Sequence, residues 1–272
     1  MSQGTVETRD CCILAFDDVG QGLPVLWQHG LGADRSQPAE VFPDTEGLRR
    51  ITLECRGHGA SALGRDAAIS IARFTEDAMA LLDHLGVERA VVGGISLGAA
   101  IALRIAALHP DRVLGLVLAR PAWVDEDAPA TLRLYRDVAE LLAAYGPEEG
   151  RRRFEALPGL AEVEAVSPDN AASLRGFFDR RDPSSTIALL SRIPGGGPGV
   201  SRQRMQALDV ATMIVANDRD YVHPLETARR LAGLIPGAQF REITSKTVDR
   251  TRYVDEFKAT LGDFLDARKG AS

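Results

Sequence analysis

The sequence predicts an α/β fold in which helices flank a mostly parallel β-sheet. Short segments rich in apolar and β-branched residues alternate with helical segments along most of the chain, a pattern typical of parallel sheets. At 272 residues and 45% hydrophobic composition, the chain is long enough for one large α/β domain or two small ones, with a sizeable core. A long helical stretch interrupts the alternation once, which predicts an insertion.

Seven segments have the composition of strands, at residues 11–16, 24–28, 50–55, 90–94, 113–119, 211–216 and 238–243. The glycine- and aspartate-containing stretch between the first two, DDVGQG, has the residues needed to turn a hairpin. Apolar residues at i, i+3 and i+4 spacing, with Gly and Pro at the ends, predict helices at about residues 71–85, 97–109, 224–235 and 249–268.

Residues 121–207 are rich in Ala, Leu, Arg and Glu and contain eight prolines. The segment IPGGGPG, residues 193–199, has the composition of a flexible loop. Because a strand pattern resumes at residue 211, we interpret 121–207 as a helical lid over the sheet. The core then consists of residues 1–120 and 208–272.

Charge and cysteine content exclude several classes of function. The net charge of −6 gives no reason to expect a nucleic acid or an anionic membrane surface as partner. The three cysteines, Cys11, Cys12 and Cys55, form no CxxC pair, which indicates reduced thiols and no metal site. We see no signal peptide, membrane span, phosphate loop or dinucleotide motif, so we expect a cytoplasmic protein without a cofactor.

The stretch VVGGISLGAA carries the strongest chemical signal. The pattern G-x-S-x-G at residues 94–98 follows a strand and precedes a helix, which is the context of a nucleophile elbow. There a serine, here Ser96, lies in a sharp turn at a helix N-terminus. Backbone N–H groups and the helix dipole favour negative charge at that point.

Together with two further loops, this motif resembles the α/β-hydrolase superfamily over nearly the whole chain. The loops are QHGLG, residues 28–32, and ECRGHGAS, residues 54–61. The resemblance implies an eight-stranded, mostly parallel sheet and a triad in the order Ser, Asp, His. It also implies an oxyanion hole formed by the N–H groups of Leu31 and Leu97. The chain departs from the usual family motifs at Glu54, where Asp is usual, and at Ile95, where His is usual.

The family's acid follows the strand at 211–216 and usually stands four positions before a proline. Pro224 therefore selects Asp220, with Asp218 as the alternative. The family's histidine is expected in the loop after the last strand, but residues 244–248 read TSKTV. The five histidines are at 29, 58, 84, 109 and 223, so the family's triad is incomplete at its usual position.

Two residues compete to replace the missing base. His223 is the best substitute among the histidines, although a residue so close to Asp220 in sequence need not reach the elbow. Lys246 occupies the loop where the histidine is expected, but the charge of Asp220 would keep it protonated. We therefore expect Lys246 to pair with Asp220 or to present its charge to an anionic substrate, with a solvated surface lysine as the remaining alternative.

Basic residues near the carboxyl ends of the strands predict a site for a carboxylate or a phosphate, because ligands of open α/β sheets bind there. Arg56 and Arg120 would join Lys246 in this site, although Arg56 has a second interpretation as a structural residue of its own turn. The predicted substrate-binding residues are His29, Arg56, Arg120, Trp123, Tyr221 and His223.

Three functions remain open on these grounds. The first is a small-molecule hydrolase of ester, lactone or C–C bonds, with Ser96 as nucleophile, Asp220 as acid and an unusual base. The second is a lyase, decarboxylase or isomerase in which Ser96 polarises a carbonyl group and Lys246 binds an anion. The third is a non-catalytic small-ligand receptor. The intact elbow and oxyanion loop favour an enzyme acting on a small molecule, as a monomer or a homodimer.

Overall fold

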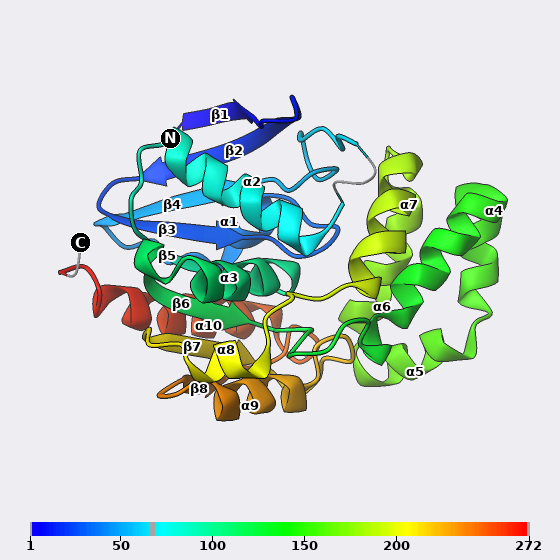
Figure 1. The fold of residues 1–272 in the computed structure, drawn as a ribbon. Coiled ribbons are helices and arrows are strands. Elements are labelled where there is room, and N and C mark those ends of the chain that lie inside the picture. The colour runs from blue at the N-terminus through cyan, green and yellow to red at the C-terminus, as the bar shows by residue number, and fades with distance from the viewer. Residues whose placement is uncertain (1, 66–68, 271–272) are drawn as a thin grey trace.

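The computed structural model describes residues 2–65 and 69–270, and its centre is a sheet with the strand order β1-β2-β4-β3-β5-β6-β7-β8 (Figure 1). β1 and β2, and β2 and β4, pair antiparallel, and all later neighbours pair parallel. The strands are β1 Ser2–Glu7, β2 Ile13–Gly20, β3 Leu23–Gln28, β4 Leu48–Leu53, β5 Ala90–Ile95, β6 Val113–Ala119, β7 Thr212–Ala216 and β8 Gln239–Glu242. The predicted eight-stranded, mostly parallel sheet is confirmed.

The predicted hairpin between the first two expected strands is wrong. β2 and β3 follow each other in the chain, but β4 lies between them in the sheet. Gly20 and Gly22 both have positive φ, and a Cβ on either would lie within 2.3 Å of the backbone oxygen of Leu48 or Gly47. The turn is therefore packed against the entry of β4, where only glycine fits.

Helices cover both faces of the sheet (Figure 1). α1 Ser36–Val41 and α10 Arg250–Asp266 share one hydrophobic core with one face. α2 Ile71–His84, α3 Leu97–Leu108, α8 Arg202–Gln206 and α9 Leu225–Leu234 contribute to the core on the other face. α2 begins where the side chain of Ser70 accepts the N–H of Arg73 and ends before Gly86, whose φ is +66°.

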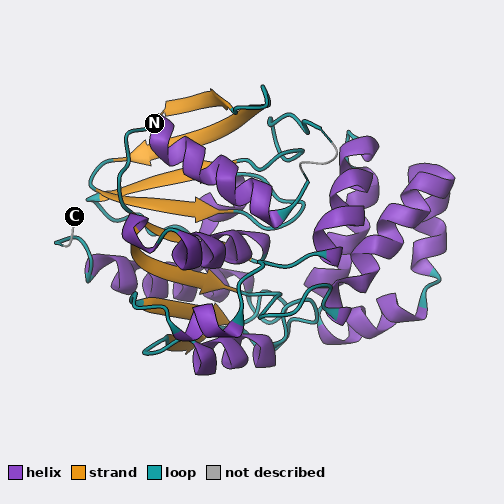
Figure 2. Cartoon of the chain, in the orientation of Figure 1, coloured by secondary structure: helices purple, strands orange, loops and turns teal. Residues whose placement is uncertain are grey.

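Five α-helices lie within the predicted lid segment 121–207: α8 packs with the helices on the sheet, and the other four lie together at one end of the molecule, as Figures 1 and 2 show. These four are α4 Arg133–Glu155, α5 Pro158–Val166, α6 Pro168–Gly176 and α7 Pro183–Arg192. Gly146, with a φ of +73°, and Pro147 break α4 into two pieces. Buried residues of these helices, such as Phe154 and Leu189, belong to the same hydrophobic core as α2 and α3. The helices thus pack as an extension of that core, beyond the carboxyl ends of the parallel strands.

No helix in the described part of the chain is both long enough and apolar enough to cross a membrane.

Candidate active site

Ser96 occupies the turn between β5 and α3 that the G-x-S-x-G pattern predicts. β5 ends at Ile95 and α3 begins at Leu97. Between them Ser96 has φ +58° and ψ −108°, a conformation that costs a non-glycine residue free energy. The two flanking glycines are required by space, because a Cβ on Gly94 or Gly98 would lie 2.6 or 2.3 Å from the carbonyl oxygen of Gln28. The close packing of the two glycines thus fixes this strained turn, and the turn places the Ser96 hydroxyl at the start of α3.

Asp220 lies on the loop after β7, as predicted, and is buried, whereas the alternative acid Asp218 is exposed. Its carboxylate accepts hydrogen bonds from the Arg120 side chain, with Nε 2.6 Å away, and from the N–H of His223 at 3.1 Å. Burial by itself raises the pKa of Asp220. The charges of Arg120 and His223 and their hydrogen bonds outweigh burial and hold the pKa below its usual value.

The imidazole of His223 lies between Asp220 and Ser96. Its Nε2 is 2.7 Å from Oγ of Ser96, and its Nδ1 is 2.9 and 3.0 Å from the two carboxylate oxygens of Asp220. The loop folds back because the Asp220 carboxylate also binds the backbone N–H of His223, three residues later. His223, the best substitute for the histidine that is absent from the β8 loop, thus reaches the elbow although it is only three residues from Asp220 in sequence.

The hydrogen bonds fix the state of the His223 ring. The carboxylate can only accept, so Nδ1 carries a proton, and Nε2 is then free to accept the Ser96 hydroxyl proton. Burial lowers the pKa of His223, the charge of Asp220 raises it, and that of Arg120 lowers it, with a net decrease. A neutral imidazole aligned in this way is suited to act as a general base near neutral pH.

Arg120 and Lys246 do not form the predicted anion site. Arg120, which follows β6 with a φ of +45°, is buried and ion-paired with Asp220. Lys246 lies instead 3.7 Å from the carboxylate of Glu40 on α1, with its ammonium 5.0 Å from the ring centre of Tyr253. The predicted pair of Lys246 with Asp220 is thus wrong, because Arg120 and His223 already occupy that carboxylate.

The loop after β3 passes close to Ser96. A Cβ on Gly30 would lie 3.5 Å from Cβ of Ser96 and 3.4 Å from the oxygen of Ile95. This proximity brings the loop that contains Leu31 to the elbow, where Leu97 begins α3. The oxyanion role of the Leu31 and Leu97 N–H groups remains a prediction, with a loop arrangement that fits it.

His29 supports this loop from inside and does not line a substrate site as predicted. It is fully buried, its Nε2 accepts the N–H of Cys55 at 3.0 Å, and its Nδ1 donates to the oxygen of Gly30 at 2.8 Å. Burial lowers the pKa of His29 to about 4. His58 lies beside it and its Nε2 accepts the N–H of Gly32 at 3.0 Å. The two neutral rings thus form hydrogen bonds with the loop after β3, His29 at Gly30 and His58 at Gly32.

Arg56 is the structural residue that its second interpretation described, and its predicted role in substrate binding is wrong. The guanidinium is fully buried and forms ion pairs at 2.7 Å with both Asp10 and Asp77. Its donors face the loop before β2 and helix α2. Arg56 thus connects these elements and has no donor directed at Ser96.

Trp123 and Tyr221, the two residues predicted to form walls of the substrate pocket, lie in different surroundings from each other. The indole N–H of Trp123 donates to the oxygen of Gly196 at 2.8 Å, so this residue holds the segment 193–199, which the sequence alone presents as flexible. Tyr221 lines a cavity of about 350 Å³ between the His223 loop and helices α4 and α5. That cavity includes the side chains of Thr131 and Asp137 and not Ser96, so contact of either aromatic ring with substrate remains a prediction.

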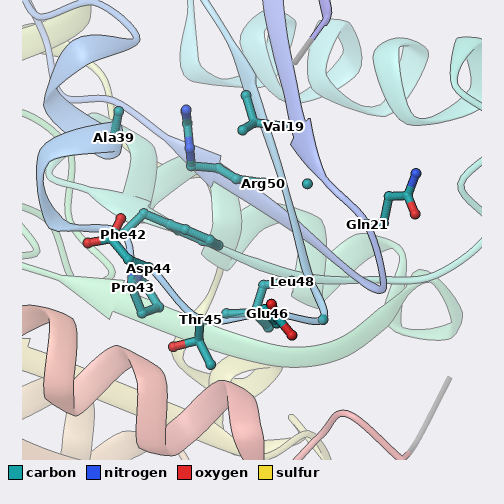
Figure 3. Close-up of a pocket in the computed structure, with 12 residues that line it drawn as sticks. Val19, Gln21, Ala39, Phe42, Pro43, Asp44, Thr45, Glu46, Leu48 and Arg50 are labelled. Atoms are coloured by element: carbon teal, nitrogen blue, oxygen red, sulfur yellow. The ribbon is translucent and has the colours of Figure 1, made fainter.

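A larger cavity, of about 560 Å³, lies at the other end of the sheet (Figure 3). It is lined by the end of β2, the loop between α1 and β4, and the amino-terminal end of β4, including Phe42, Asp44, Glu46, Leu48 and Arg50. Ligands of parallel α/β sheets bind at the opposite, carboxyl ends. Its charged groups are also engaged, for example Asp44 with Lys258. We therefore place the chemistry at Ser96.

Among the described residues, no cluster of His, Cys, Asp or Glu has the arrangement of a metal site. The groups gathered at Ser96 are a hydroxyl, a neutral imidazole and a carboxylate. Groups in this arrangement are chemically able to transfer a proton and to attack a carbonyl carbon.

Comparison with known proteins gives a consistent result. A family model described as the alpha/beta hydrolase fold matches residues 24–246. A 2-hydroxymuconate semialdehyde hydrolase of Pseudomonas putida is 30% identical over 230 residues, which cover 82% of this chain and 79% of that protein. A second protein of that name, from Pseudomonas sp. (strain CF600), is 29% identical over 91% of this chain and 88% of its own length.

Solved structures share the fold. An enol-lactonase from Burkholderia xenovorans LB400 superposes with a TM-score of 0.76 at 21% identity, over 97% of this chain and all of the other. An esterase from Thermogutta terrifontis gives a TM-score of 0.75 at 24% identity, over 99% of this chain and all of the other.

Proposed function

The chain belongs to the α/β-hydrolase family of enzymes, and from this premise we propose that it hydrolyses a small carbonyl compound by a serine mechanism. Ser96 is the nucleophile, His223 the general base and Asp220 the acid that orients it. The single observation that carries the proposal is the position of His223, within hydrogen-bond distance of both Ser96 and Asp220. The sequence has no histidine in the loop after the last strand, where the family usually has its base, and we assign that role to His223.

The proposed reaction proceeds in two halves. Nε2 of His223 takes the Ser96 proton while Oγ bonds to the carbonyl carbon, and the carbonyl π electrons move onto oxygen. The N–H groups of Leu31 and Leu97 are the candidate donors to that oxyanion. As the carbonyl re-forms, the bond to the leaving group breaks, and His223 gives its proton to that group. Water then repeats the sequence and releases the acid product and free Ser96.

An ester or lactone is the substrate class that this machinery serves most directly. The leaving group is then an alcohol oxygen, which a single imidazolium can protonate. Cleavage of a C–C bond next to a carbonyl is the second candidate. It is favoured by the likeness to two relatives whose names give 2-hydroxymuconate semialdehyde as the compound hydrolysed. The lyase and receptor alternatives depended on the absence of a base, and His223 removes that reason for them.

Reaction with a fluorophosphonate probe tests the proposal, because such probes label a serine only when a base activates it. We expect labelling of Ser96 in the wild type, none in S96A and strongly slowed labelling in H223Q. The exposed His109, which contacts neither Ser96 nor Asp220, gives the matched control H109Q, which should label like the wild type. Equal labelling of H223Q and wild type would refute His223 as the base.

A further inference from the structure

Arg180, between the lid's short 3-10 helix Phe177–Asp179 and α7, reaches onto the loop that follows β3. Its Nη2 donates to the carbonyl oxygen of Gly32 at 2.5 Å, and its guanidinium lies 5.5 Å from the ring centre of Phe177. The same phenyl ring packs against Gly32, where a Cβ would fall 2.4 Å from it. Two lid side chains thus meet the loop that carries Leu31, the predicted oxyanion donor.

The charge of Arg180 is not compensated within the described part of the chain. Other basic groups near the site have carboxylate partners: Arg56 has Asp10 and Asp77, Arg120 has Asp220, and Lys246 has Glu40. No carboxylate in the described residues lies within 4 Å of the Arg180 guanidinium.

The surroundings of Arg180 are partly buried and offer little else to balance its charge. Burial lowers the pKa of Arg180, and Asp34 raises it only through its charge at longer range. The nearby His29 and His58 are neutral, and the charge of Arg180 lowers the pKa of both. A guanidinium in such a place gains from an anionic ligand, because burying an unpaired charge costs free energy.

The guanidinium contacts the loop that passes Ser96, next to the predicted oxyanion donor Leu31. Gly32, which it binds, is two residues from Gly30, and a Cβ on Gly30 would be 3.5 Å from Cβ of Ser96. The N–H of Leu31 lies between these two glycines in the chain. Arg180 therefore reaches this loop from the lid at the residue that follows Leu31, the predicted oxyanion donor.

We propose that Arg180 binds a carboxylate of the substrate and makes the enzyme selective for carbonyl compounds with a second, anionic group a few atoms from the scissile bond. The inference rests on the proposed serine hydrolysis and assigns the anion site to Arg180 in place of Arg56, Arg120 and Lys246. One of the five N–H donors serves Gly32, and the others can form a two-point contact with a planar carboxylate. A monoanion matches a single arginine, whereas a phosphate dianion would need a second free cation.

Two esters of equal chain length test the selectivity. Mono-4-nitrophenyl succinate ends its acyl chain in a carboxylate, and 4-nitrophenyl butyrate ends it in a methyl group. We expect R180Q to reduce the ratio of kcat/KM for succinate over butyrate by about 10- to 100-fold, as for loss of a charge-assisted two-point contact. R180K should keep part of the preference, and R181Q, the same charge change at the exposed neighbouring residue, should keep all of it.

If R180Q loses kcat/KM equally on both esters, the ratio is unchanged and Arg180 only positions the loop, which would overturn the proposal. A variant that loses kcat/KM on neither ester would overturn it as well. Thermal unfolding checks that each variant is folded, and R180K serves if R180Q is not.

A binding measurement separates this inference from the proposed function. Succinate should raise the Tm of S96A and not that of S96A/R180Q. If neither ester is cleaved in a Ser96-dependent way, the proposed hydrolysis fails, and the succinate shift still decides for or against the site at Arg180. An equal shift in both proteins would refute the site.

Discussion

The loops after β7 and β8 leave adjacent parallel strands at the same edge of the sheet, yet only the first reaches Ser96. The β7 loop carries Asp220 and His223, both buried and hydrogen-bonded to each other. The β8 loop directs Lys246 toward helix α1 and supports its neighbour instead, because the hydroxyl of Ser245 donates to the oxygen of Arg219 at 3.1 Å. One loop thus holds both the proposed acid and the proposed base, and the contacts of the next loop are structural.

The largest difference between the two loops should appear in turnover. H223Q should lower kcat for an activated ester by about 10³-fold or more, because it removes the base, as in other serine triads. K246M should stay within about threefold of the wild type. Initial rates with 4-nitrophenyl butyrate measure both, and H109Q is the control. A greater loss in K246M than in H223Q would reverse the comparison.

The next effect concerns what holds Asp220. R120Q removes the ion pair at 2.6 Å and leaves the carboxylate to His223 and backbone contacts alone, so we expect kcat to fall about 10- to 100-fold. The variant should also unfold more readily, by about 3 kcal/mol, because half of a buried pair remains. R120K tests positioning, since it keeps the charge and should recover part of the rate.

If R120Q loses only stability, with kcat unchanged in the folded protein, then Arg120 does not position the acid. Thermal unfolding together with kcat and KM, measured below the unfolding transition, separates the two effects.

A smaller effect is expected in the pH profile. The net decrease in the pKa of His223, from an ordinary value of 6.5, places the acid limb of kcat/KM below pH 6.5, because the protonated ring cannot accept the Ser96 proton. The charge of Arg120 contributes to this decrease. R120Q should therefore move the limb to higher pH, because it removes a positive charge that lowers the pKa of His223. A limb that moves to lower pH in R120Q would contradict the assignment to His223.

The smallest effect belongs to the β8 loop. Lys246 and Glu40 are partly exposed and 3.7 Å apart, so their coupling should contribute about 0.5–1 kcal/mol to the free energy of unfolding. A double-mutant cycle of E40Q and K246M in urea measures it, and its value should decrease in high salt. A coupling of several kcal/mol would show that this loop has a larger structural role than its contacts suggest.

The sequence was sufficient for seven of the eight strands, the elbow and the position of Asp220, because each is set by local pattern. Glycines around Ser96 follow from contacts with Gln28, and strand composition marks both ends of the Asp220 loop. β1 was missed, since its residues, Ser2–Glu7, have few apolar side chains and lie at the edge of the sheet. The strand order that separates β2 from β3 depends on long-range pairing, which the turn residues alone do not determine.

Roles of charged side chains were harder to predict because they depend on which partner lies nearest in space. Arg56, Arg120 and Lys246 all follow strand ends, but each faces a different carboxylate. His223 was undervalued for a related reason, since distance along the chain is a poor measure of where a buried ring points. Arg180 carried no signal in the sequence, as nothing in its neighbours indicates contact with Gly32.

The three-residue spacing of Asp220 and His223 has a consequence for motion. In a triad spread over three loops, each catalytic group can drift by itself, whereas here one hydrogen-bonded turn carries two of them. Alignment then depends on a single displacement, that of the turn relative to the elbow. Asn170 of α6 connects this turn to the helices beyond the sheet, since its side-chain oxygen accepts the N–H of Val222 at 3.0 Å. Opening of α6 would thus release acid and base together, and slow amide hydrogen exchange at Val222 would report the closed, aligned state.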